Sequence, residues 1–209
     1  METQSAATLR LAVFPRSSLL TDVLLVCAGT LFVALCAQVS FHLGFTPVPI
    51  TLQTFAVLLV ASAYGAMLGT ASLLLYLLIG IAGAPVYADH KHGWYEFIGA
   101  SGGYIVGFVV AAALTGYLAE RGWDRRFSTS VTVMLTGNVV IYVFGLLWFH
   151  HWLGANPDIA KDIGLATSWD GTLTGGLYPF VPGDVVKLYL AALALPGAWK
   201  LVERVKRPR

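Results

Sequence analysis

The feature that most constrains this chain is a series of six apolar stretches, each close to the length that crosses a lipid bilayer. They cover about residues 19–38, 51–64, 67–83, 102–119, 130–152 and 182–199. A transmembrane helix needs ~20 predominantly apolar residues. Hydrophobic residues make up 57% of the chain and charged residues 11%, whereas charges reach about a quarter of a soluble domain. The sequence therefore predicts an all-α membrane protein with six transmembrane helices, forming one integral membrane domain over residues 1–209.

The basic residues indicate how these helices are oriented. Ten of the 13 Lys and Arg residues fall in three segments that six spans place on one side of the membrane. They are Arg10, Arg16, Arg121, Arg125, Arg126, Lys200, Arg204, Lys206, Arg207 and Arg209. Lys91 and Lys161 fall on the opposite side. Because cytoplasmic loops carry an excess of Lys and Arg, we expect both termini in the cytoplasm. We also interpret the first apolar stretch as a retained helix rather than a cleaved signal peptide, since it exceeds a usual signal core.

Several kinds of chemistry have no motif in this sequence. The dipeptide Gly-Lys never occurs, so the phosphate-binding loop of ATPases is absent, and so is the His-Glu-x-x-His zinc motif. Cys27 and Cys36 lie nine residues apart, with no Cys-x-x-Cys spacing. We therefore expect no metal site, no cofactor and no enzymatic activity. An intramembrane enzyme ranks last among the functions considered.

Two charged residues, Asp184 and Lys187, stand at the start of the last apolar stretch. On a helix that begins near Pro182 they lie three residues apart, on one face and within reach of each other. A charge in a membrane helix costs about 2.5 kcal/mol or more, so it usually faces an interior cavity and a partner. We interpret the pair as a candidate binding site. The alternative is an ion pair that only locks helix packing.

Other polar residues are expected near this pair. Gln53 and Tyr87 fall near the outer ends of their segments, as Asp184 does, so three regions of the chain place polar groups at one depth. A carboxylate accepts hydrogen bonds and an ammonium donates them, so the site suits a neutral group that presents both, such as a urea-like ring. Asn138, in mid-membrane, is expected to hydrogen-bond either a ligand or another helix. The aromatic residues expected to cover the ligand are Trp94, Tyr95, Tyr104 and Tyr178.

Small residues recur at every fourth position of the fourth stretch, at Gly99, Gly103, Gly107 and Ala111. Such a stripe lets a neighbouring helix approach closely. We favour ordinary packing within the chain as its role. The alternative is contact with another copy in a homo-oligomer.

Five blocks of sequence, taken together and in this order, resemble a known family. The blocks are 47–53 (PVPITLQ), 75–80 (LYLLIG) followed by 84–87 (APVY), 102–108 (GGYIVGF), 141–145 (IYVFG) with Trp148, and 178–187 (YPFVPGDVVK). They are similar to the BioY family, the biotin-specific substrate-binding components of energy-coupling factor (ECF) transporters. Pro-x-Pro-Ile-Thr-Leu-Gln and Pro-Gly-Asp-x-x-Lys are the specific parts of this match.

The resemblance implies a protein of the prokaryotic plasma membrane that captures biotin from outside. By that likeness Asp184 and Lys187 bind the ureido ring, residues around Tyr87 cover the ligand, and Lys91 is the candidate for the carboxylate. Import then needs a separate ECF transmembrane coupling protein and ATPase subunits, with membrane lipid as the surroundings and no nucleic acid partner. The loop 88–98 and the small-residue pattern Thr30-x-x-x-Ala34 depart from the family pattern. A self-sufficient secondary carrier or channel for a small polar solute is the alternative function.

Overall fold

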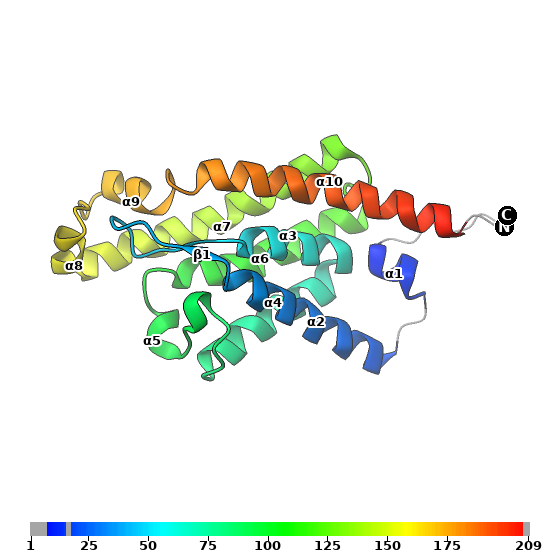
Figure 1. The fold of residues 1–209 in the computed structure, drawn as a ribbon, viewed down its shortest axis with the longest axis horizontal. Helices are drawn as coiled ribbons and strands as arrows, with labels where there is room; N and C mark the ends of the chain where they lie inside the picture. Colours follow the sequence, from blue (N-terminus) through cyan, green and yellow to red (C-terminus); the bar gives the residue numbers. More distant parts are fainter. Residues whose placement is uncertain (1–7, 16–17, 207–209) are drawn as a thin grey trace.

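The computed structural model describes residues 8–15 and 18–206 of the chain, and six long helices dominate it (Figure 1). They are α2 (Leu19–Ala37), α3 (Gln53–Tyr64), α4 (Ala66–Ile81), α6 (Gly102–Glu120), α7 (Phe127–Ala155) and α10 (Val181–Lys206). Each overlaps one of the predicted apolar stretches. The predicted cytoplasmic residues Arg16, Arg207 and Arg209 lie outside the described residues.

The bundle is built around α6, which contacts α3, α4 and α7. α10 packs on α3 and α7, and α2 packs on α3 and α4. The small-residue stripe of α6 lies against α7. A Cβ added at Gly103 would come within 2.2 Å of the Trp148 side chain, and one at Gly107 within 3.0 Å of the Ile141 backbone. The interpretation of this stripe as packing within the chain is therefore confirmed at these two positions.

α3 is short because the chain before it forms an extended loop. In that loop β1 (Ser40–Phe41) pairs with β2 (Ile50–Thr51) in antiparallel register, Ser40 opposite Thr51. Twelve helical residues rise about 18 Å at 1.5 Å per residue, which is less than the ~30 Å of a bilayer core. The amino end of α3 lies inside the molecule, where Gln53 is buried. Gly65, with φ of 87°, turns the chain directly from α3 into α4.

The structure corrects the predicted elements at several places. α7 and α10 extend beyond the predicted stretches 130–152 and 182–199 at both ends. The predicted long loop 153–176 contains two short helices, α8 (Pro157–Asp162) and α9 (Trp169–Gly176). The β1–β2 pair departs from the all-α prediction. Further short helices are α1 (Leu9–Val13), the 3-10 turn η1 (Ala88–His90) and α5 (Trp94–Phe97).

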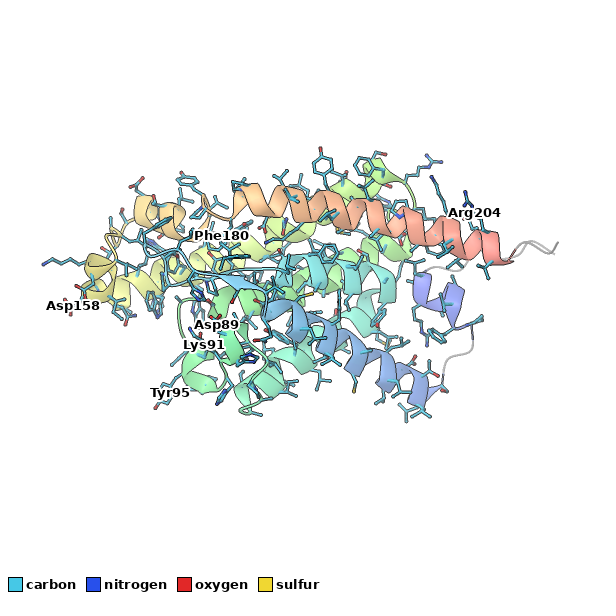
Figure 2. The ribbon with its side chains drawn as sticks, viewed as in Figure 1. Asp89, Lys91, Tyr95, Asp158, Phe180 and Arg204 are labelled. Atoms are coloured by element: carbon cyan, nitrogen blue, oxygen red, sulfur yellow. The ribbon has the colours of Figure 1, made fainter. Side chains whose placement is uncertain are left out.

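Four of the long helices are long and apolar enough to cross a membrane, namely α2, α6, α7 and α10, whereas α3 and α4 are shorter apolar helices. The two ends of the molecule differ in charge. α1 and the carboxyl end of α10 lie at the same end, with Arg204 exposed there, while Asp158 lies at the opposite end (Figures 1 and 2). At the first of these ends Arg10 of α1 is buried and forms an ion pair with Asp22 of α2. α1 is thereby tied to the first long helix.

Candidate functional site

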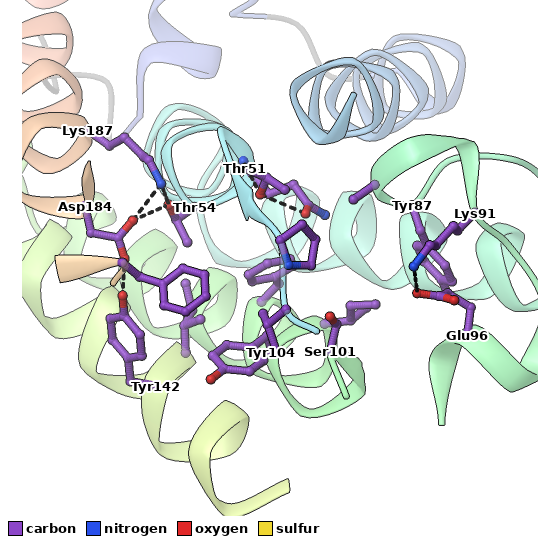
Figure 3. A pocket seen from close by; sticks show the side chains of 18 residues that line it. Thr51, Thr54, Tyr87, Lys91, Glu96, Ser101, Tyr104, Tyr142, Asp184 and Lys187 are labelled. Atoms are coloured by element: carbon purple, nitrogen blue, oxygen red, sulfur yellow. Dashed lines mark hydrogen bonds and ion pairs between the residues drawn. The ribbon is translucent and has the colours of Figure 1, made fainter. Parts of the chain in front are cut away.

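A cavity opens between α3, α6, α7, α10 and the loop that follows α4 (Figure 3). Space not filled by protein atoms, the open mouth included, amounts to about 710 Å³. Binding pockets for small organic molecules mix apolar walls with a few placed polar groups. The polar and charged residues that line this cavity are Thr51, Gln53, Thr54, Lys91, Glu96, Ser101, Asp184 and Lys187, together with three tyrosines, Tyr87, Tyr104 and Tyr142.

Asp184 and Lys187, the inner pair, lie on one side of the cavity. Their side chains meet with 2.7 Å between Lys187 Nζ and Asp184 Oδ1, as the three-residue spacing predicts. Asp184 is 5% exposed and Lys187 9%. Thr54 of α3 donates to Asp184 Oδ1 at 3.2 Å, and Tyr142 of α7 donates to Asp184 Oδ2. Three helices therefore converge on this one carboxylate.

The hydrogen-bond capacity of the inner pair is largely, but not completely, used. A carboxylate has about four acceptor positions, and three donors engage Asp184, two on Oδ1 and one on Oδ2. An ammonium has three donors, and Lys187 Nζ has two acceptors, Asp184 Oδ1 and Thr54 Oγ1, the latter at 3.4 Å. One acceptor position and one donor position remain. The pair is thus suited to a neutral ligand group that brings one donor and one acceptor.

Gln53 lies at the amino end of α3 and lines the same cavity. Its amide is oriented from both sides. Nε2 donates to Tyr76 Oη at 2.7 Å, and Oε1 accepts from Thr51 Oγ1 at 2.9 Å. Gln53 is 7% exposed and Tyr76 is completely buried. A buried amide with both ends engaged has one rotamer, so it presents a fixed edge to the cavity.

Tyr87 forms part of the cavity wall and is held against α4. Its hydroxyl donates to the carbonyl of Leu77 at 2.8 Å. Its ring lies so close to Gly80 that a Cβ there would be 2.3 Å away. Burial, and secondarily the nearby Glu96 carboxylate, raise the pKa of Tyr87 to about 12. The phenol therefore stays neutral, and remains a hydrogen-bond donor, over the physiological pH range.

One residue at the end of α2, Gln38, holds the loop that carries Tyr87. Its Nε2 lies 3.1 Å from the Tyr87 carbonyl oxygen and 3.4 Å from that of Val86, and its Oε1 accepts from the His90 backbone N–H at 3.0 Å. This loop, residues 84–93, covers one side of the cavity, and we call it the cover loop. Sequence reasoning did not assign Gln38 any role.

Lys91, the predicted carboxylate-binding residue, lines the cavity together with Glu96 of α5. Its Nζ is 3.3 Å from Glu96 Oε1, and the two side chains are 46% and 33% exposed. We call them the mouth pair. In Figure 3 the mouth pair lies across the cavity from the inner pair.

Two predicted site residues do not line the cavity. Asn138 is 6% exposed in the interior of α7, with its Oδ1 lacking a hydrogen-bond partner among the described residues. Tyr178 is 57% exposed. Of the predicted aromatic cover, Tyr104 lines the cavity, whereas Trp94 and Tyr95 are exposed and absent from its lining.

Sequence reasoning missed Thr54 and Tyr142, which both contact Asp184. A signal for each was present. Thr54 directly follows Gln53, and Tyr142 lies within the block 141–145. Phe108 and Phe180 add apolar cavity wall that was not predicted either. Within residues 8–15 and 18–206, no three or more His, Cys, Asp or Glu side chains gather as they would around a metal ion.

Comparisons with known proteins agree on one family. The model of the BioY family matches residues 4–204. "Biotin transporter BioY" of Thermotoga maritima is 35% identical over 176 residues, which is 84% of this chain and 94% of that protein. "Probable biotin transporter BioY" of Pyrococcus horikoshii is 36% identical over 166 residues, 78% of this chain and 88% of that one.

A solved structure has the same fold. It is the crystal structure of the S-component for biotin from an ECF-type ABC transporter. The two superpose with a TM-score of 0.68 at 24% sequence identity, covering 87% of this chain and 92% of the other.

Proposed function

Because this chain belongs to the BioY family, we propose that it captures biotin in the cavity described above and presents it for import. It is a multi-pass membrane protein, as its apolar helices and relatives indicate. The observation that carries the proposal is the unfilled capacity of the inner pair. Asp184 keeps one acceptor position and Lys187 one donor position. The ureido ring of biotin presents N–H donors and a carbonyl acceptor on adjacent atoms.

In this proposal the ureido carbonyl accepts from Lys187 Nζ and one ureido N–H donates to Asp184 Oδ2. The remaining apolar part of biotin packs on the cavity walls, where Tyr104, Phe108 and Phe180 supply aromatic surface. Such burial stabilises the complex by roughly 25 cal/mol per Å² of apolar area. The valerate tail then points away from the inner pair, and Lys91 receives its carboxylate.

We further propose six membrane spans in one integral membrane domain, with both termini in the cytoplasm. α3 and α4 are short for a bilayer core, but the loop 38–52 precedes α3 and the cover loop follows α4, so each segment gains length at the cavity end. The excess of Lys and Arg at the opposite end supports a cytoplasmic position for that end. The cavity then opens to the outside.

The energy for import comes, in this proposal, from an ECF coupling protein and ATPase subunits. The chain has no Gly-Lys dipeptide and hence no phosphate-binding loop of its own. Capture and energisation are therefore divided between different chains.

Calorimetric titration of the purified full-length protein with biotin tests the proposal. We expect saturable binding of one biotin per chain with a Kd below ~1 μM, which corresponds to about 8 kcal/mol. Binding weaker than that overturns it. Uptake by vesicles that contain this chain alone, abolished when the proton gradient is collapsed, would instead support a self-sufficient carrier.

A further inference from the structure

The mouth pair is an unusual arrangement for a cavity that is to receive an anionic ligand. Lys91 and Glu96 both line the cavity, and Nζ lies 3.3 Å from Oε1. The carboxylate thus occupies the position beside the ammonium where a ligand carboxylate would bind. Among the described residues, neither charged group has a second ion-pair partner. The charges of Lys91 and Glu96 therefore cancel each other at the mouth of the cavity.

The backbone holds both members of the mouth pair in place. The Lys91 N–H donates to the Ala88 carbonyl and the Tyr87 N–H to the Lys91 carbonyl, both at 3.1 Å. The two residues between, Asp89 and His90, have φ of 58°, so the chain makes a tight turn that directs Lys91 back toward Tyr87. Glu96 lies in the first turn of α5. A tight turn and a helical turn thus bring the two charges together.

The Glu96 carboxylate acts on the cavity as well as on Lys91. Its negative charge contributes, after burial, to the raised pKa of Tyr87, which also lines the cavity. A second carboxylate arriving beside Lys91 would meet this charge. Either Glu96 gives up its contact with Lys91, or two like charges share one ammonium.

We propose that Glu96 is a resident carboxylate that pairs with Lys91 before the ligand binds and is displaced by the carboxylate of the ligand. The inference rests on biotin capture as the function of the cavity. Glu96 then acts as a specificity-determining residue. It lowers the affinity for ligands with an anionic tail and does not change the affinity for ligands with a neutral tail. The ratio of the affinity for biotin to that for its esters or amides is therefore smaller than it would be with Lys91 and no Glu96.

The substitution Glu96→Gln tests this directly. Gln keeps the shape of the side chain and removes its charge. Because a partly exposed ion pair contributes up to ~1 kcal/mol, we expect biotin to bind up to about fivefold more tightly to the variant. Biotin methyl ester, whose tail is neutral, should bind the variant and the wild type equally. Both ligands are titrated into the purified full-length protein at low and high salt, and the gain for biotin should shrink at high salt.

Two further variants separate displacement from a general change of charge. In a Lys91→Met background there is no ammonium for the two carboxylates to compete for. The gain in biotin affinity over ester affinity that Glu96→Gln produces should therefore be smaller there than in the wild-type background. Asp158→Asn removes an equal charge from exposed α8, which lies away from the cavity at the end of the molecule (Figure 2). We expect no change in either affinity for that variant.

The results that would overturn the inference are distinct. If Glu96→Gln weakens biotin binding or leaves it unchanged while the wild type binds biotin, Glu96 does not compete with the ligand, and the proposed function stands. If the variant gains equally for biotin and the ester, the effect is not directed at the carboxylate. If the wild type binds neither ligand, the proposed function and this inference fail together.

Discussion

Asp184 has partners from three different helices, and each of them stabilises a carboxylate that is only 5% exposed. Lys187 comes from the same helix, Thr54 from α3 and Tyr142 from α7. A buried ion pair contributes little to stability when it is complete, but removal of one member costs ~3–5 kcal/mol because the other stays buried and unpaired. The inner pair is therefore sensitive to single substitutions for two reasons, folding and ligand binding.

We predict that Asp184→Asn and Lys187→Ala each weaken biotin binding more than tenfold, since each removes a group that hydrogen-bonds the ureido ring. Both should also lower the melting temperature. The double variant Asp184→Asn with Lys187→Met leaves no unpaired charge, so its melting temperature should recover while its biotin binding stays lost. Titration and thermal melting of the same preparations check this. Full affinity in the single variants would mean that the pair only stabilises helix packing.

Asp124, in the turn between α6 and α7, is a completely buried acid that does not line the cavity. Its Oδ2 accepts from Trp199 Nε1 at 2.6 Å, whereas its Oδ1 has no hydrogen-bond partner among the described residues. Burial raises the pKa of Asp124, and the Trp199 hydrogen bond offsets part of this. The folded protein thus binds the Asp124 proton more tightly than the unfolded chain does.

The sign of the resulting pH effect follows from this raised pKa. Below the ordinary Asp pKa of ~3.9 the acid is protonated in both states and has no effect, and above it the ionised form costs the folded state stability. Asp124→Asn stays neutral and keeps an oxygen for Trp199. We predict that it is at least as stable as the wild type at pH 7, with an advantage that shrinks toward pH 4. Asp124→Leu, which loses the acceptor, should be less stable. Melting curves of Asp124→Asn that show a loss at pH 7 would contradict the argument.

At the scale of elements, the long helices were predictable and the short ones were not. Hydropathy located all six long helices, because each must be apolar on most of its surface. α5 and α9 have no such requirement. α9 is eight residues long, three of them glycine, and lies on α7, so tertiary contact rather than local sequence makes it helical. The amino end of α7 and the carboxyl end of α10 were missed because polar residues, Ser128 and Thr129 in α7 and those from Lys200 onward in α10, continue these helices beyond the apolar stretches.

Residues of the candidate site were predictable where they carry a charge or stand at the end of an apolar stretch. They were not predictable where the face of the helix on which they lie decides whether they reach the cavity. Gln53, Tyr87 and Lys91, which the sequence singled out, line one cavity together with the inner pair. Asn138 and Tyr142 are one helical turn apart on α7, yet Tyr142 lines the cavity and Asn138 does not. The depth of a residue within the bundle decides whether it reaches the cavity, and this depth cannot be derived from hydropathy.

The cover loop depends on one hydrogen-bonding side chain at the end of α2. Gln38→Ala removes the donors to the Val86 and Tyr87 carbonyls and the acceptor for the His90 N–H. At about 1 kcal/mol net per bond, we predict at least tenfold faster dissociation of biotin, with a smaller change in the association rate. Gln38→Glu retains the acceptor, so its dissociation rate for biotin should lie between those of the wild type and Gln38→Ala. Stopped-flow or filter-binding kinetics give both rates. An unchanged dissociation rate would show that the loop does not retain the ligand.

At the scale of the whole molecule, the positions of the charges divide it into two ends. Lys91 and Asp158 lie toward one end and Arg204 lies at the other (Figure 2). Six spans require that the segment before α2 and the carboxyl end of α10 face the same side, and an odd number requires that they do not. The side of the membrane that these two segments face also determines which side the cavity faces. Cysteine labelling distinguishes these cases without perturbing the cavity.

We predict a defined labelling pattern in a background with Cys27 and Cys36 replaced by Ala. Gly154→Cys, where an added Cβ meets no atom within 4 Å, should react with a membrane-impermeant maleimide in intact cells. Pro15→Cys and Arg204→Cys, both at exposed positions, should react only after the membrane is permeabilised. Labelling of Pro15→Cys but not Arg204→Cys in intact cells would mean an odd number of spans. The fully reversed pattern would mean that the cavity faces the cytoplasm, so capture from outside would be wrong. The positive-inside rule would then not hold for this chain.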